Sequence, residues 1–200
     1  MKNKDEKSIL NLSKAYQRAE ESILNAVNSH KASNVKDYQK LVNKAVSDAV
    51  KMLADKNKKF VERELPKAFS EGQKEVQGHT PTVHTVMTAK DVSVILRQAG
   101  FRYSGKGLQY DTYIEVQKAT ENAGKGFLSR VNKKIKELEK NGEDTLYNVE
   151  QAVKDDLQKN GINVVEYKNG TKVSLDSYAK MAVRSARIES KNGGIICHYP

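Results

Sequence analysis

The side chains that could support catalytic or metal chemistry are few and scattered along this chain. The four histidines are His30, His79, His84 and His198, and Cys197 is the single cysteine. A structural zinc site usually needs four nitrogen or sulfur ligands at close spacing, and these residues form no such set. We therefore predict no metal site and no cofactor, and we interpret His79 and His84 as exposed loop residues.

The carboxylates and the glycines also lack a catalytic pattern. Adjacent acidic residues such as Asp155 and Asp156 are typical of a solvated helix face, and no local motif assembles Ser-His-Asp chemistry. Gly105-Lys106-Gly107 resembles a phosphate loop only superficially, because the Gly-x-x-x-x-Gly-Lys-Ser/Thr pattern is absent. We predict that the protein is not an enzyme.

The composition indicates a thin core and a basic surface. Hydrophobic residues make up 38% of the chain, charged residues make up 30%, and the net charge is +10, mostly from lysine. One interpretation is a solubilising lysine surface, and the other is contact with a polyanion such as DNA. Aromatic residues do not alternate with the basic ones, so the sequence gives no sign of single-strand stacking.

The cellular compartment is predicted from three features that the sequence lacks: a cysteine pair, a signal segment and a membrane span. A single cysteine cannot form an internal disulfide, the charged N-terminus contains no apolar signal segment, and no window approaches the ~20 apolar residues of a membrane span. We expect a protein made and assembled in the cytosol, with no membrane partner.

The N-terminal part of the chain has the apolar period of long helices. One helix is predicted over about residues 5–28, and a second runs from Val35 into the Val61 region. Two such helices joined by a short polar break suggest an antiparallel helical hairpin. Leu65-Pro66 should interrupt the second helix, which either kinks or restarts there, and Pro66 is well placed to begin a short new helix.

The central part begins with a loop over residues 77–84, the best candidate for a hinge. A helix capped by Thr88 is expected over residues 91–98, and a long helix over 111–140. Gly124 and Gly126 should weaken the middle of the long helix at roughly 1 kcal/mol each and cause a kink or break there. Asn141-Gly142 should end it, and a further helix should run from Asp144-Thr145 to Gln158, ended by Asn160 and a left-handed Gly161.

The C-terminal part changes character. Short runs of β-forming residues flank Asn169-Gly170, the strongest two-residue hairpin signal. Ser174 should then cap a last helix. On this helix Tyr178, Met181 and Arg184 lie on roughly one face. They could pack on the hairpin, with Tyr178 and Met181 facing the core, or they could form a surface for a partner; we prefer the packing interpretation.

These C-terminal residues resemble the phage minor capsid protein 2 family. The resemblance rests on Tyr167, Asn169-Gly170, Val173 and the segment from Ser177 to Arg184, which contains Tyr178-x-x-Met181-x-x-Arg184. A second segment, Leu65-Pro66-Lys67-Ala68-Phe69-Ser70-Glu71-Gly72, is similar to the family's Pro-Lys-Ala-aromatic-x-x-Gly element. The family-motif residues, which we expect to be structural, are Tyr167, Gly170, Val173, Tyr178, Met181, Arg184, Pro66 and Gly72.

The resemblance implies a structural protein of the phage or prophage virion, related in role to the Mu F-like head morphogenesis proteins. Its partners would be portal or capsid subunits, with packaged DNA as a further candidate and a homo-oligomer left open. Family members usually continue into a Cys-Pro-x-Cys-like element, whereas this chain ends at Cys197-His198-Tyr199-Pro200, so we expect a C-terminally short form. The alternatives are a non-sequence-specific nucleic-acid-binding accessory protein and a prophage remnant that modulates head assembly.

The expected fold is mainly α, with long amphipathic helices and a small C-terminal β-hairpin plus helix. Three segments are predicted: a helical N-terminal arm or hairpin (1–77), a central helical region (78–160) and the hairpin-helix unit (161–200).

Overall fold

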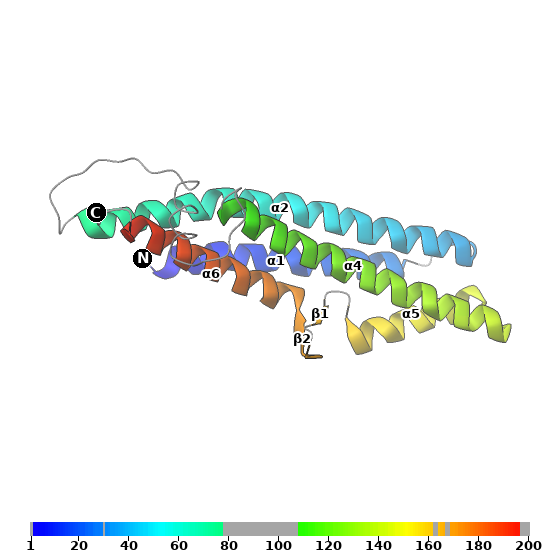
Figure 1. Ribbon diagram of the computed structural model, residues 1–200. Coiled ribbons are helices and arrows are strands. Elements are labelled where there is room, and N and C mark those ends of the chain that lie inside the picture. Colours follow the sequence, from blue (N-terminus) through cyan, green and yellow to red (C-terminus); the bar gives the residue numbers. More distant parts are fainter. Residues whose placement is uncertain (1, 30, 78–107, 162–163, 167–168, 197–200) are drawn as a thin grey trace. The chain divides into compact units, whose positions relative to one another are not determined.

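The computed structural model describes residues 2–29, 31–77, 108–161, 164–166 and 169–196 of the chain. Within these ranges the protein is mainly helical, which confirms the predicted fold class. The described elements are α1 (Lys2–Val27), α2 (Val35–Gln77), α4 (Leu108–Asn141), α5 (Leu146–Asn160), β1 (Val164–Glu166), β2 (Lys172–Ser174) and α6 (Leu175–Ile196) (Figure 1).

The chain groups into two compact units. The first comprises Met1–Lys56 with Lys118–Tyr178, and the second comprises Asn57–Gln117 with Ala179–Pro200. This grouping differs from the three consecutive segments that the sequence suggested. The long helices α2 and α4 each contribute one part to each unit, so a boundary drawn at a loop cannot follow the packing.

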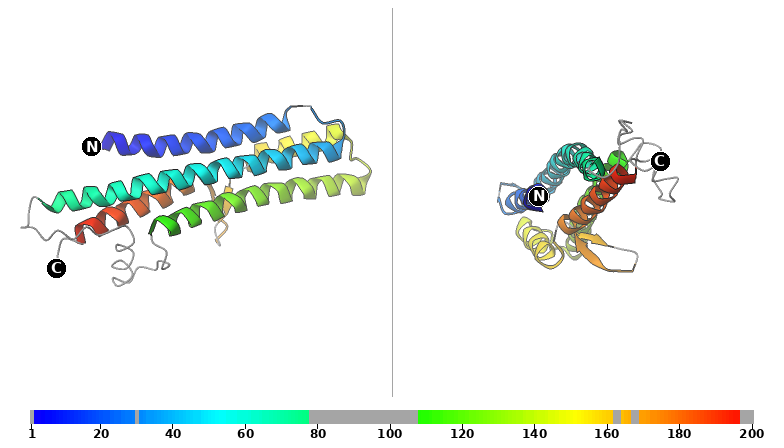
Figure 2. Two further views of the ribbon diagram at one scale, coloured as in Figure 1. Left: turned by 90° about the horizontal axis from the view of Figure 1, so that it is seen from above. Right: turned by 90° about the vertical axis from the view of Figure 1, so that its left-hand side faces the viewer.

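The first unit is built on α1 and the first half of α2. These two helices are the expected helical pair joined by a short break, and α1 runs alongside α2 in Figure 2. The start of α2 is capped, since the Asn34 Oδ1 atom accepts a hydrogen bond from the Asp37 backbone N–H at 2.9 Å. Ser33 Oγ donates to Asp37 Oδ2 at 2.7 Å, and this bond holds the pKa of Asp37 below its ordinary value.

The core of the first unit follows the apolar stripes read from the sequence. The second half of α4 and the shorter α5 supply the other buried faces. Its buried apolar side chains include Leu12, Tyr16, Ala19, Ile23 and Val27 of α1; Tyr38, Val42, Val46, Ala49 and Leu53 of α2; Ala123, Phe127, Val131 and Ile135 of α4; and Val149, Val153 and Leu157 of α5.

Helix α4 is continuous through its glycines, so the predicted break in its middle is wrong. Gly124 is buried beneath α2, where an added Cβ would lie 3.1 Å from Val50 Cγ2 and 3.2 Å from Val46 Cγ1. Gln39 of α2 also donates to Asn132 Oδ1 of α4 at 2.6 Å. These tertiary contacts offset the weak helix propensity of glycine, which a single-helix argument cannot include.

Helix α2 is likewise continuous through Pro66, so the predicted interruption at Leu65-Pro66 is wrong. Proline inside a helix costs about 3 kcal/mol because it removes one hydrogen bond and crowds the preceding turn. Buried residues lie on both sides of it, with Val61 and Leu65 before and Ala68 and Phe69 after. Burying such side chains stabilises the protein by about 1.5–3 kcal/mol for each large one, which is enough to keep the helix intact.

The predicted helix ends around α5 are confirmed. Gly142, just after α4, has φ +70°, and Thr145 caps α5 by accepting a hydrogen bond from the Asn148 backbone N–H at 3.2 Å. Gly161 ends α5 with φ 65° and ψ 175°, so φ is positive as expected while ψ is extended rather than left-handed helical. Arg130 of α4 fixes this end by donating to Asp156 Oδ2 at 2.8 Å and to the Gly161 carbonyl at 2.7 Å.

The predicted hairpin is also present. Strands β1 and β2 pair antiparallel, with Val165 opposite Val173, and Gly170 between them has φ +80°. Ser174 then caps α6, since its Oγ accepts from the Ser177 backbone N–H at 3.2 Å. Local turn and cap chemistry therefore sets this whole segment.

Several predictions fall outside the described residues. They are the hinge loop from Gly78 onward, the helix over 91–98, Gly105-Lys106-Gly107, the four histidines, Cys197 and Tyr167. Among the helices that the structure describes, none is both long and apolar enough to cross a membrane.

Candidate functional site

The C-terminal helix α6 has one buried face and one exposed face. Its buried side chains from Ala179 onward, all in the second unit, are small: Ala179, Ala182, Val183, Ala186 and Ser190. Small residues let the backbones of neighbouring helices approach closely. In this unit Val61, Leu65 and Ala186 form a buried apolar cluster against which Tyr113 packs.

Two glycines set the distance between α6 and the second half of α2. A Cβ placed on Gly72 of α2 would overlap the Lys191 carbonyl of α6, and one placed on Gly194 of α6 would overlap the Phe69 carbonyl of α2. Each glycine therefore lies against the backbone of the opposite helix. Any larger residue at either position would force the two helices apart.

Three polar contacts hold the same pair of helices together. Ser190 Oγ donates to the Leu65 carbonyl at 2.7 Å in a buried position. Arg187 pairs with Glu71 at 2.8 Å, and Lys191 pairs with Glu75 at 2.5 Å. Because these contacts run along α6 from residue 187 to 191, they fix the rotation of the helix as well as its position.

The opposite face of α6 is exposed and carries apolar side chains. Met181 is 49% exposed and Ile188 is 61% exposed, and they are seven residues apart, or two helical turns. Arg184 and Ser185 lie between them and Asn192 follows one turn later, all exposed. We call Met181, Arg184 and Ile188 the outer α6 stripe.

Some of the family-motif residues shape the backbone or the helix packing, and others belong to the outer α6 stripe. Gly170 makes the hairpin turn, Val173 is a half-buried residue of β2, and Tyr178 is half-buried near the start of α6. Pro66 lies inside α2 and Gly72 lies at the close crossing with α6. The structure thus brings Gly72 against α6, while Gly170 and Val173 belong to the hairpin of the first unit.

The preferred packing interpretation is wrong for Met181, which was expected to face the core. Its side chain is exposed, as is that of Arg184, because the alanines and Val183 occupy the buried face of α6. Ile188, the second apolar side chain of the stripe, was not predicted. Its spacing of seven residues from Met181 was a usable signal, since positions i and i+7 share a helix face.

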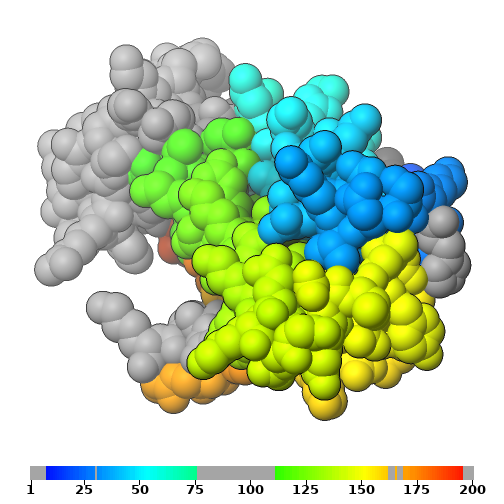
Figure 3. Space-filling view, turned by 90° about the vertical axis from the view of Figure 1, so that its right-hand side faces the viewer, coloured from blue at the N-terminus to red at the C-terminus, as the bar shows by residue number. Residues whose placement is uncertain are grey.

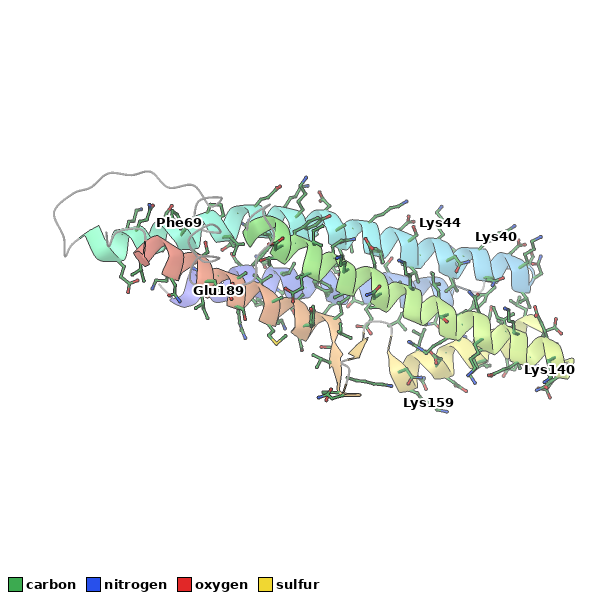
Figure 4. All side chains as sticks on the ribbon, in the orientation of Figure 1. Lys40, Lys44, Phe69, Lys140, Lys159 and Glu189 are labelled. Carbon is green, nitrogen blue, oxygen red and sulfur yellow. The ribbon has the colours of Figure 1, made fainter. Side chains whose placement is uncertain are left out.

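Buried polar groups elsewhere offer little chemistry. Burial, and then the Glu150 carboxylate, raise the pKa of Tyr38 far above its ordinary value, and its hydroxyl has no hydrogen-bond partner among the described residues. Burial also raises the pKa of Glu189 on α6, which Figure 4 labels together with Phe69 of α2. No group of three or more histidine, cysteine or acidic side chains suited to a metal ion occurs in the described ranges.

Neither the protein-family models, nor the curated proteins, nor the solved structures contain a match to this chain. Helix α6 is thus anchored to α2 by one face and exposes the apolar side chains of Met181 and Ile188 and the cationic side chain of Arg184 on the other.

Proposed function

We propose that the protein is a structural component of a tailed-phage or prophage head, which binds portal or capsid subunits through the outer α6 stripe. The observation that carries this proposal is the exposure of Met181 and Ile188 on a helix whose other face is locked to α2. Methionine and arginine are both enriched at the centres of protein interfaces. A partner groove could take the two apolar side chains and pair a carboxylate with Arg184.

The resemblance supports the identity of the partner. Tyr178-x-x-Met181-x-x-Arg184 and the Pro66 to Gly72 segment are the parts of the chain that are similar to the phage minor capsid protein 2 family. Gly72 makes the close crossing that anchors α6, and Met181 and Arg184 belong to the exposed stripe. The similar segments thus include both the anchor and part of the proposed surface, and the location would be the virion head.

The test is co-purification with the portal and major capsid proteins of the same phage or prophage. The wild-type chain should associate with at least one of them, and Met181→Glu with Ile188→Glu should abolish that association. Leu10→Glu is the matched control, because Leu10 is also exposed, at 53%, but lies on α1. It should bind like the wild type.

Two results would oppose this function. Wild-type protein that associates with neither partner in co-assembly would remove the head-protein proposal altogether. Association that survives the double substitution, with helicity unchanged by circular dichroism, would show that a different surface makes the contact.

A further inference from the structure

A second surface, in the first unit, is lined by lysines. An open groove of about 820 Å³ follows one side of α4 between residues 125 and 140. Its charged lining residues are Lys125, Lys133, Lys136, Glu137 and Lys140, and the others are Leu128, Ser129 and Asn132. Over these sixteen positions the sequence has six basic residues and two acidic ones, so the local charge is strongly positive.

Most of these lysines have no ion-pair partner among the residues that the structure describes. Glu137 lies 3.1 Å from Lys134 and 3.9 Å from Lys133. Lys125, Lys136 and Lys140 have no ion pair with any residue in the described ranges. In the second unit, by contrast, lysines do form ion pairs, including Lys58–Glu62, Lys67–Glu71 and Lys191–Glu75. Helix stabilisation by ion pairing therefore does not account for Lys125, Lys136 and Lys140.

Helix α2 adds further cations beside the groove. The hydrogen bond from Gln39 to Asn132 places the start of α2 next to this part of α4. Lys36, three residues before Gln39, lies on nearly the same side of α2 and is exposed, whereas Lys40 and Lys44, also exposed, lie about 100° and 140° around the helix from Gln39. Figure 3 shows the first half of α2 (blue) meeting the last half of α4 (yellow-green), and Figure 4 shows Lys40, Lys44 and Lys140 directed outward. Lys40 forms an ion pair with Asp37 at 3.5 Å.

We propose that this lysine face, defined by Lys36 of α2 with Lys125, Lys136 and Lys140 of α4, binds the phosphate backbone of double-stranded nucleic acid without reading its sequence. From residue 125 to residue 140 α4 is about 22 Å long at 1.5 Å per residue. That length spans about six phosphates of one strand at 3.4 Å each. Lysine acts as a point charge, which positions a duplex without specifying bases.

The residues that line the groove disfavour two other ligands, a single-stranded nucleic acid and an apolar protein surface. The lining contains no aromatic side chain on which an unpaired base could stack, which disfavours a single strand. Leu128 is its one large apolar residue, whereas the centre of a protein interface is usually apolar and depleted of charge. A duplex backbone needs neither feature.

The experiment is a salt titration of the full chain with a fluorescently labelled duplex of about 30 base pairs and mixed sequence, which spans the ~22 Å face several times over. Three phosphate contacts give a slope of about −2.7 for log affinity against log salt, or about a 40-fold loss between about 50 and 200 mM salt. The variant Lys125→Gln, Lys136→Gln, Lys140→Gln should flatten the slope by about that amount.

The matched control is Lys14→Gln, Lys74→Gln, Lys159→Gln. It removes the same charge from exposed lysines that also lack an ion pair in the described part of the chain. The control should retain nearly the wild-type slope, with both variants as helical as the wild type by circular dichroism. Equal effects of the two triple variants would overturn the proposal, because net charge alone would then explain binding.

Three further outcomes would also overturn it. They are no affinity of the wild type for the duplex at low salt, tighter binding to a single strand of the same length, and tighter binding to polyglutamate. The last would show that the lysine face is made for an acidic polypeptide.

Discussion

The close crossing of α2 and α6 predicts that two glycine-to-alanine substitutions will have opposite effects. At Gly72 the new Cβ would meet the Lys191 backbone, which cannot turn aside as a side chain can, and would lie 3.2 Å from the Ile195 nitrogen. At Gly126, in the interior of α4, nothing lies within 4 Å of an added Cβ. The two variants share the same local chemistry and differ only in the space available.

The magnitudes follow from two terms. Alanine in place of glycine within a helix stabilises by about 1 kcal/mol, and this is the whole effect expected for Gly126→Ala. Overpacking costs about 1–3 kcal/mol, and a backbone overlap belongs near the upper limit. Gly72→Ala should therefore lower the free energy of unfolding by about 2 kcal/mol net, and the two variants should differ by about 3 kcal/mol.

The assay is urea unfolding followed by far-ultraviolet circular dichroism, supported by thermal melting. For a chain of this size, 1 kcal/mol shifts the Tm by about 2–4 °C. Gly72→Ala should melt about 4–8 °C below the wild type, and Gly126→Ala about 2–4 °C above it. If both changed the free energy of unfolding equally, within about 0.5 kcal/mol, the close crossing would be refuted.

Two further substitutions test buried polar groups of the first unit. Tyr38→Phe removes a buried hydroxyl that has no described partner, so denaturation should show stability unchanged or raised by about 1 kcal/mol; a larger loss would mean that the hydroxyl is hydrogen-bonded. The pKa of Tyr38 in the folded protein lies above the ordinary 10.0, so the folded state favours the neutral phenol. The stability that this preference supplies is fully present below about pH 10 and is lost as the pH rises further. In an alkaline titration of unfolding, Tyr38→Phe should therefore lose less stability above about pH 10 than the wild type. Arg130→Met leaves the 6%-exposed carboxylate of Asp156 without its cation, so the free energy of unfolding in urea should fall by about 3 kcal/mol. The double variant Arg130→Met, Asp156→Leu should recover part of that loss. No recovery would contradict the pairing.

What could be predicted from the sequence was local. Thr145 and Ser174 as caps, Gly142 as a helix end and Gly170 as a hairpin turn all depend on backbone requirements within a few residues. The spacing of apolar residues also gave the stripes of α1 and α2, because a helix period is itself a local property.

What could not be predicted depends on neighbours distant in the chain. Pro66 and Gly124 disfavour a helix by themselves, and only burial of the residues around Pro66 and the contact of Gly124 with Val46 and Val50 keep α2 and α4 continuous. The same limit applies to Met181. Its spacing from Tyr178 and Arg184 shows a shared face but cannot show which face of α6 another helix covers.

The orientation of Met181 follows from the glycine crossing rather than from hydrophobicity. Gly194 is thirteen residues after Met181, which corresponds to about 220° around an α-helix at 3.6 residues per turn. Since Gly194 must face the Phe69 backbone of α2, Met181 is held on roughly the opposite side. Isolated exposed side chains such as Leu10 and Tyr147 need no explanation. The exposure of Met181 and Ile188, unlike that of Leu10 and Tyr147, is imposed by the packing of α6. The helix cannot rotate to bury them without separating Gly194 from Phe69. A substitution at Gly72 should therefore weaken the proposed docking as well as the fold, whereas Gly126→Ala should leave docking unchanged.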